Sequence, residues 1–136
     1  MSFKQVICEG TLLAEIVLSE YEPDVTTFLS SPNSQLQLGV MSHPQGFVES
    51  AHFHPELNRG TCATQQFFVV TRGEIDLKFY TKDGFLHETV TLRVGDAALI
   101  IAGVHSIHVK ENSRCLTVKQ GPFLGAENDK IEVKLK

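Results

Sequence analysis

The chain has 136 residues and a formal net charge of −4, with 42% hydrophobic and 21% charged residues. This is the composition of an ordinary folded domain, and it excludes disordered and collagen-like chains. Because nucleic-acid binders present a basic patch or stripe, we expect no nucleic-acid partner for this acidic chain. Its length fits one domain of roughly 100–150 residues, so we predict a single domain over residues 1–136.

The strongest periodic signal is that of short β-strands. Segments rich in Val, Ile, Phe, Thr and Leu are separated by Gly, Pro, Asn and Asp about every ten residues, which is typical of sandwiches and barrels. Asp83-Gly84 predicts a tight hairpin turn, and Pro23 can open at most one short helical turn. We therefore predict an all-β fold, with strands at 12–18, 36–41, 47–54, 65–71, 74–80, 87–93, 97–101, 104–110, 115–120 and 131–135.

Neither the apolar runs nor the first residues point to a membrane or to secretion. No apolar run approaches the roughly 20 residues that a spanning helix needs, and the opening MSFKQVICEG lacks the apolar core of a signal peptide. Three cysteines, Cys8, Cys62 and Cys115, are widely spaced and form no C-x-x-C pair. We expect a cytoplasmic protein with free thiols and no membrane partner.

Two histidines on one predicted strand mark the candidate site. Residues two apart on a strand point to the same face, so His52 and His54 would project together. Farther along, the segment GDAALIIAGVHSIH brings His105 or His108 from another strand. Since a metal ion needs three or four convergent donors, these histidines together predict a metal site.

The same segments resemble the two motifs of the cupin family. Residues 46–54, GFVESAHFH, match the first-motif pattern G-x5-H-x-H, and residues 66–73, QFFVVTRG, match its E-x6-G end with Gln66 in the glutamate place. Residues 95–103, GDAALIIAG, match the second motif with Ile101 in the proline place, and His105 comes one residue early. The likeness covers about residues 37–120, and the tail VKQGPF resembles the ending of a group of small bacterial cupins.

What the resemblance implies is a cupin-type barrel, or double-stranded β-helix, around a divalent transition metal. His52, His54, Gln66 and His105 would be the metal ligands, with His108 structural or outward-facing. Three neutral imidazoles suit Fe, Mn, Ni or Zn and leave positions for water, oxygen or substrate. Gln66 is a neutral amide, so it compensates less of the metal's charge than a glutamate does. The reaction is open among oxygenase, isomerase and lyase chemistry.

The substrate would meet residues near the mouth of the barrel. Residues 55–65 form a longer loop than the family motif has at this place, offering Glu56, Arg59 and Cys62 to substrate or metal. Glu56 could supply the missing carboxylate. We further predict that Phe67 and Tyr80 line the pocket and that Lys119 holds an anionic group of a small-molecule substrate.

Two other functions stay open at this point. Nucleotide-sugar 3,4-ketoisomerases also pair an H-x-H with a glutamine, which favours metal-free acid–base catalysis by His52, His54 and His105. The lost glutamate alternatively favours a non-catalytic binding protein. Cupins commonly dimerise through outer strands, so we expect a homodimer that pairs along an edge at residues 12–18.

Overall fold

The computed structural model describes residues 2–60, 63–122 and 124–136. The chain divides into two compact units, each considered by itself. The first, called the β unit, is formed by Met1–Tyr21 and Thr64–Lys136. The second, called the loop unit, is formed by Glu22–Ala63.

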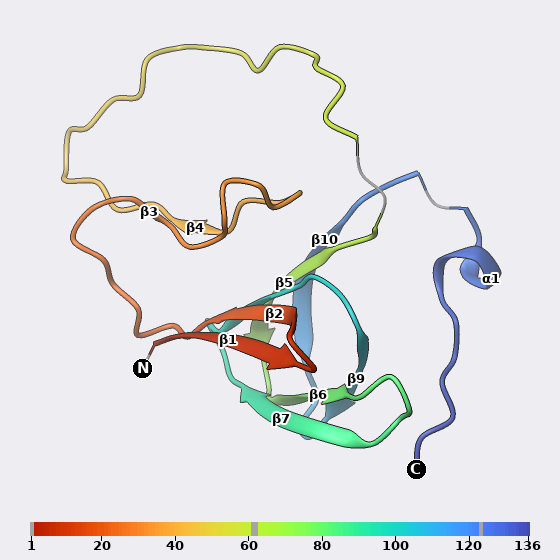
Figure 1. Ribbon diagram of the computed structural model, residues 1–136. Coiled ribbons are helices and arrows are strands. Elements are labelled where there is room, and N and C mark those ends of the chain that lie inside the picture. Colours follow the sequence, from red (N-terminus) through yellow and green to blue (C-terminus); the bar gives the residue numbers. More distant parts are fainter. Residues whose placement is uncertain (1, 61–62, 123) are drawn as a thin grey trace. The chain divides into compact units, whose positions relative to one another are not determined.

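Two antiparallel sheets build the β unit (Figure 1). The first sheet has the strand order β1, β2, β8, β5, β10, and the second has the order β7, β6, β9. Helix α1 is a single turn, and no helix in the described part of the chain is long and apolar enough to cross a membrane. The bounds in chain order are β1 Phe3–Cys8, β2 Thr11–Val17, β5 Gln66–Arg72, β6 Ile75–Tyr80, β7 Leu86–Leu92, β8 Ala97–Ile100, β9 Val104–Val109, β10 Arg114–Lys119 and α1 Ala126–Asp129.

One hydrophobic core joins the two sheets. Alternate residues of β1, β5, β6, β7 and β8 point into it, as the period of two requires, and β2 adds Leu13, Ala14 and Ile16. A fully buried Phe or Leu stabilises the fold by about 1.5–3 kcal/mol, so this cluster supplies most of the driving force for folding. Its largest members are Ile16, Phe68, Ile75, Leu77, Phe79 and Leu92, each no more than 2% exposed.

The core ends at strand β9, and this end positions the candidate site. His105 lies opposite Phe79 across the β6–β9 pair, and Ile107 lies opposite Leu77. Cross-strand partners share a face, so His105 and Ile107 lie on the core side of the sheet. Leu77 and Phe79 are 0% exposed, yet Ile107 is 46% exposed. The core side of β9 is therefore open.

Most of the predicted strands are confirmed, and with them the all-β class. The predictions at 12–18, 65–71, 74–80, 87–93, 97–101, 104–110 and 115–120 match observed strands to within one residue at each end. The Asp83-Gly84 turn is also confirmed, since the Gly84 N–H donates to the Thr81 carbonyl at 3.0 Å. A helical turn at Pro23 and a strand at 131–135 are wrong, because neither segment shows that structure.

Strand β1 is missing from the sequence prediction and changes the edge of the first sheet. Glu9 and Gly10 connect β1 to β2 with φ values of 51° and 75°, the two positive values that a type I′ hairpin needs. β2 consequently lies between β1 and β8. The prediction that residues 12–18 form a dimer edge is therefore wrong, because both of their neighbours are already paired. The homodimer itself stays a prediction.

The loop unit has little regular structure. Its two short strands, β3 (Thr27–Phe28) and β4 (Gly39–Val40), pair with each other. Only residues 39–40 of the strand predicted at 36–41 are formed. Beside this pair, the Ser42 N–H donates to Thr26 Oγ1 at 3.0 Å.

The strand predicted at 47–54 is wrong, because these residues are irregular and exposed. Val48 and Phe53 are each 84% exposed. A strand exists only through its partner, and within the described residues no segment pairs with 47–54. Figure 1 draws this stretch, coloured yellow to yellow-green, as a long loop without an arrow.

Candidate functional site

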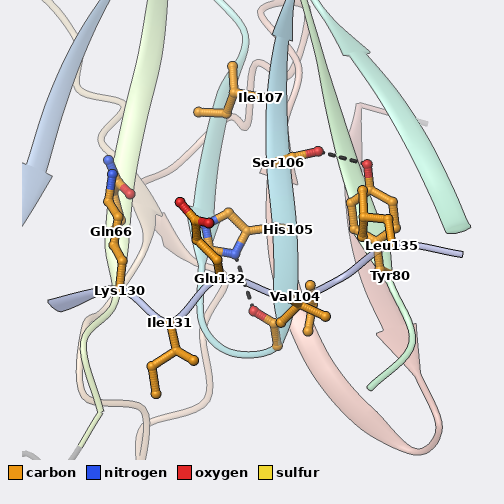
Figure 2. Close-up of a pocket in the computed structure, with 12 residues that line it drawn as sticks. Gln66, Tyr80, Val104, His105, Ser106, Ile107, Lys130, Ile131, Glu132 and Leu135 are labelled. Atoms are coloured by element: carbon orange, nitrogen blue, oxygen red, sulfur yellow. Dashed lines mark hydrogen bonds between the residues drawn. The ribbon is translucent and has the colours of Figure 1, made fainter. Parts of the chain in front are cut away.

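A pocket of about 690 Å³ lies in the β unit where the core side of β9 is open. This volume falls within the range of about 300–1,000 Å³ that is common for small-molecule sites. One side is formed by Gln66 of β5, Tyr80 of β6 and residues 103–107, and the other by residues 130–133 and Leu135 of the C-terminal tail (Figure 2). Gln66, Tyr80 and His105 were predicted as site residues from the sequence, and the fold brings them to one pocket.

His105 carries an oriented ring in this pocket. Its Nδ1 lies 3.2 Å from the carbonyl oxygen of Gly103, the contact shown as a dashed line in Figure 2. A neutral imidazole that donates from Nδ1 keeps its lone pair on Nε2. This arrangement is typical of metal-bound histidines, whose other ring N–H donates to a carbonyl or carboxylate. His105 is thus set to bind a ligand through Nε2.

Gln66 presents its amide oxygen at the start of β5. Its Nε2 donates to Thr117 Oγ1 at 3.0 Å, and within the described residues the oxygen Oε1 makes no hydrogen bond. The amide oxygen is the atom by which a glutamine can coordinate a cation. Lys119 is paired directly with Gln66 across the two strands and is exposed, but it does not border the pocket. Its contact with substrate stays a prediction.

Tyr80 belongs to a hydrogen-bonded chain of three side chains. Its hydroxyl lies 2.8 Å from Ser106 Oγ, which lies 2.9 Å from Nε2 of His108. Tyr80 is only 7% exposed. His108 and Ser106 share the face of β9 opposite to that of His105, in agreement with an outward-facing His108.

Phe67 points to the opposite face of the sheet from its two sequence neighbours, Gln66 and Phe68. It alternates along β5 with Gln66, which borders the pocket, and with Phe68, which lies in the core. Phe67 therefore points to the other face of the sheet and is not one of the pocket residues. Its predicted contact with substrate remains a prediction.

In the loop unit, His52 and His54 lie together without a strand to hold them. Their ring centroids are 5.2 Å apart and the ring planes meet at 86°. His52 Nδ1 lies 2.7 Å from the Ser50 carbonyl oxygen, and its Nε2 lies 3.3 Å from a carboxylate oxygen of Glu49. A neutral ring has one N–H and can donate to only one of these acceptors. Nε2 of His52 could bind a metal only after its contact with the Glu49 carboxylate is broken.

Of the remaining predicted site residues, Glu56 and Arg59 are exposed. Glu56 and Arg59 lie in the irregular part of the loop unit, and Cys62 falls outside the described residues. Cys8 and Cys115 are free thiols, and partial burial raises the pKa of Cys115. Within residues 2–60, 63–122 and 124–136, no three His, Cys, Asp or Glu side chains are grouped as a metal site would require.

Two parts of the pocket were missed from the sequence. Ser106 gave no signal of its own. Residues 131–135 alternate apolar and charged side chains, which predicted a strand, although they run unpaired along the pocket. No local pattern could place this tail, since contacts with a distant turn decide its position.

The protein was also compared with known families and folds. No family model, curated protein or solved structure matches the chain.

Proposed function

We propose that this chain is a cupin-type, metal-dependent enzyme that acts on a small molecule in the pocket around His105. The proposed ligands of a divalent Fe, Mn, Ni or Zn ion are His52, His54, His105 and Gln66. The observation that carries the proposal is the orientation of His105, whose Nδ1 contact with Gly103 leaves Nε2 as the donor atom.

The chemistry of these donors fits such a metal. Imidazole nitrogen is a common ligand of all four ions, and the amide oxygen of Gln66 is a weaker neutral donor. His105 and Gln66 border the same pocket, so a small molecule or ion bound at one residue can also reach the other. When bound, the metal would polarise a substrate oxygen or activate water. The reaction would be an oxygenation, an isomerisation or a lyase reaction of a small molecule.

The test compares two histidines of the same strand. His105→Ala removes the proposed ligand, whereas His108→Ala removes an imidazole that points to the opposite face of β9. Protein is purified without chelator, reconstituted with Fe, Mn, Ni and Zn in turn, and its metal content is measured. The expected result is about one equivalent in the wild type and in His108→Ala, and a strong loss in His105→Ala.

Each possible outcome of this test leads to a different conclusion about His105. If the reconstituted wild type takes up less than about a tenth of an equivalent of every metal, the proposed metal dependence is wrong. Equal loss in both variants would show that the effect is not specific to His105. A double variant His52→Ala/His54→Ala, compared with His43→Ala, applies the same test to the loop unit.

A metal-free acid–base enzyme is a second candidate, favoured by two proton carriers in one pocket. His105 and Tyr80 both border it, and an imidazole and a phenol can each act as general acid or base. Keto sugars linked to dTDP or UDP would be assayed for solvent deuterium uptake with EDTA present. Uptake that EDTA leaves unchanged and His105→Ala abolishes would favour this function over the metal-dependent one.

A further inference from the structure

The C-terminal tail forms a whole wall of the pocket. Lys130, Ile131, Glu132, Val133 and Leu135 all border it. Figure 2 shows the tail crossing in front of strand β9, and Glu132 of the tail and His105 of β9 both line the pocket. The tail therefore brings new side chains to the site that the strands provide.

A turn far away in the sequence holds the tail in place. The backbone N–H of Lys136 donates to the Gly84 carbonyl at 3.1 Å. A Cβ at Gly84 would come within 2.5 Å of the Lys134 carbonyl oxygen, and Gly84 has a φ of 92°. Only a residue without a Cβ allows this close approach.

Among the described residues that border the pocket, Glu132 alone carries a carboxylate. The other titratable residues that border it are His105, Tyr80 and Lys130, and Gln66 is neutral. Among the described residues, the Glu132 side chain makes no hydrogen bond or ion pair. Its charge is therefore available to a ligand in the pocket.

We propose that Glu132 is the carboxylate ligand of a divalent cation bound at His105, in the role that Gln66 cannot fill. This inference rests on the proposed function. A dication among neutral imidazoles and an amide lacks charge compensation, and one carboxylate supplies it. Because the tail carries Glu132, binding of the cation and docking of the tail stabilise each other.

The test measures binding of Co²⁺ alone, by calorimetry and by the visible absorption of the bound ion. Glu132→Gln keeps the size of the side chain and removes its charge. We expect it to weaken binding by roughly 10- to 100-fold or more, as for other changes close to a metal, and to alter the absorption spectrum. Glu56→Gln instead removes one carboxylate of the loop unit, the one that follows His54, and we expect it to change neither the affinity nor the spectrum.

A second pair of variants tests the tail. Gly84→Ala places a Cβ against Lys134, whereas Gly10→Ala, at a φ of 75°, meets nothing within 4 Å. Both introduce similar backbone strain. We expect only Gly84→Ala to expose the tail to hydrogen exchange and to weaken Co²⁺ binding. Circular dichroism verifies that each variant is folded.

Each result bears on the inference. If Glu132→Gln binds Co²⁺ like the wild type while His105→Ala does not, Glu132 is not a ligand and the proposed function survives. If Glu56→Gln weakens binding and Glu132→Gln does not, the carboxylate comes from the loop unit and the inference is wrong. If the wild type binds no Co²⁺ or other divalent metal, both the inference and the proposed function are wrong.

Discussion

Side chains of the same type are buried in the β unit and exposed in the loop unit. Phe79 in the β unit is 0% exposed, whereas Phe53 in the loop unit is 84% exposed. Both lie in segments whose composition favours strands, but only the segment of Phe79 has partners on both sides, in β7 and β9. Strand propensity is therefore realised through pairing and burial, and is not a property of the segment by itself.

The histidines show the same contrast. His105 lies on a paired strand, and its ring is oriented by a carbonyl of the turn before it. His52 and His54 lie on an irregular segment, and within the described part of the chain the hydrogen-bond, ion-pair and ring contacts of His52 are with Ser50, Glu49 and His54. A strand can hold a ligand within a few tenths of an ångström, whereas an unpaired segment must be ordered when the ligand binds.

The largest expected effect breaks the core of the β unit. Phe79→Ala should lower the free energy of unfolding by about 3–5 kcal/mol, because it leaves a cavity at a fully buried position. The matched variant Phe53→Ala should change it by less than about 0.5 kcal/mol. Urea denaturation followed by circular dichroism measures both. Similar losses in the two variants would show that Phe53 is buried in solution.

A smaller effect concerns side chains that accept backbone hydrogen bonds. In the β unit, Asp96 is 7% exposed and accepts the N–H of Ser19 at 2.9 Å and that of Arg93 at 2.8 Å. Asp96→Ala should cost about 2–3 kcal/mol, since two backbone N–H groups lose a charged, buried acceptor. In the loop unit, Thr26→Val removes the acceptor of Ser42 and should cost about 1 kcal/mol or less. Urea midpoints that rank the pair in the reverse order would contradict the contrast between the units.

The smallest effect is a dependence on pH at the surface of the β unit. A hydrogen bond from Lys110, with further attraction from Lys110 and Arg93, lowers the pKa of Glu74 despite partial desolvation. Since the pKa is lower in the folded state, the stabilisation is present above the ordinary value of 4.5 and is lost as the pH falls through the folded pKa. Stability at neutral pH should therefore drop slightly in Glu74→Gln, and the difference from the wild type should vanish in acid.

At alkaline pH the same pair behaves in the opposite sense. The hydrogen bond to Glu74 raises the pKa of Lys110 above 10.5, so its contribution is present below that value and is lost as the pH rises through the folded pKa. Glu56→Gln in the loop unit is the control. Urea midpoints of the wild type and the variants, measured from acid to alkaline pH, check both predictions. If the difference in stability between the wild type and Glu74→Gln stays constant as the pH falls into the acid range, the prediction is wrong.

Much of the β unit could be predicted from the sequence, and the reason is local. The strands between residues 65 and 120 alternate apolar and polar side chains and are separated by turns such as Asp83-Gly84, so their existence and their buried faces followed directly. Strand β1 was not predicted because the Glu9-Gly10 turn is a weaker hairpin signal than Asp-Gly or Asn-Gly. The strand expected at 47–54 failed because its alternation says nothing about whether a partner exists.

For the candidate site, the sequence by itself determined the residue types and the all-β class. The likeness of residues 66–73 and 95–105 to the cupin motifs pointed to Gln66 and His105, and Tyr80 was expected to line the pocket; the fold brings all three to one pocket. Only the tertiary structure decided that β2 is not an edge, that the core side of β9 is open, and that the tail carries Glu132 into the pocket. These features depend on contacts between residues far apart in the chain, such as Gly84 with Lys136, and local periodicity carries no information about such contacts.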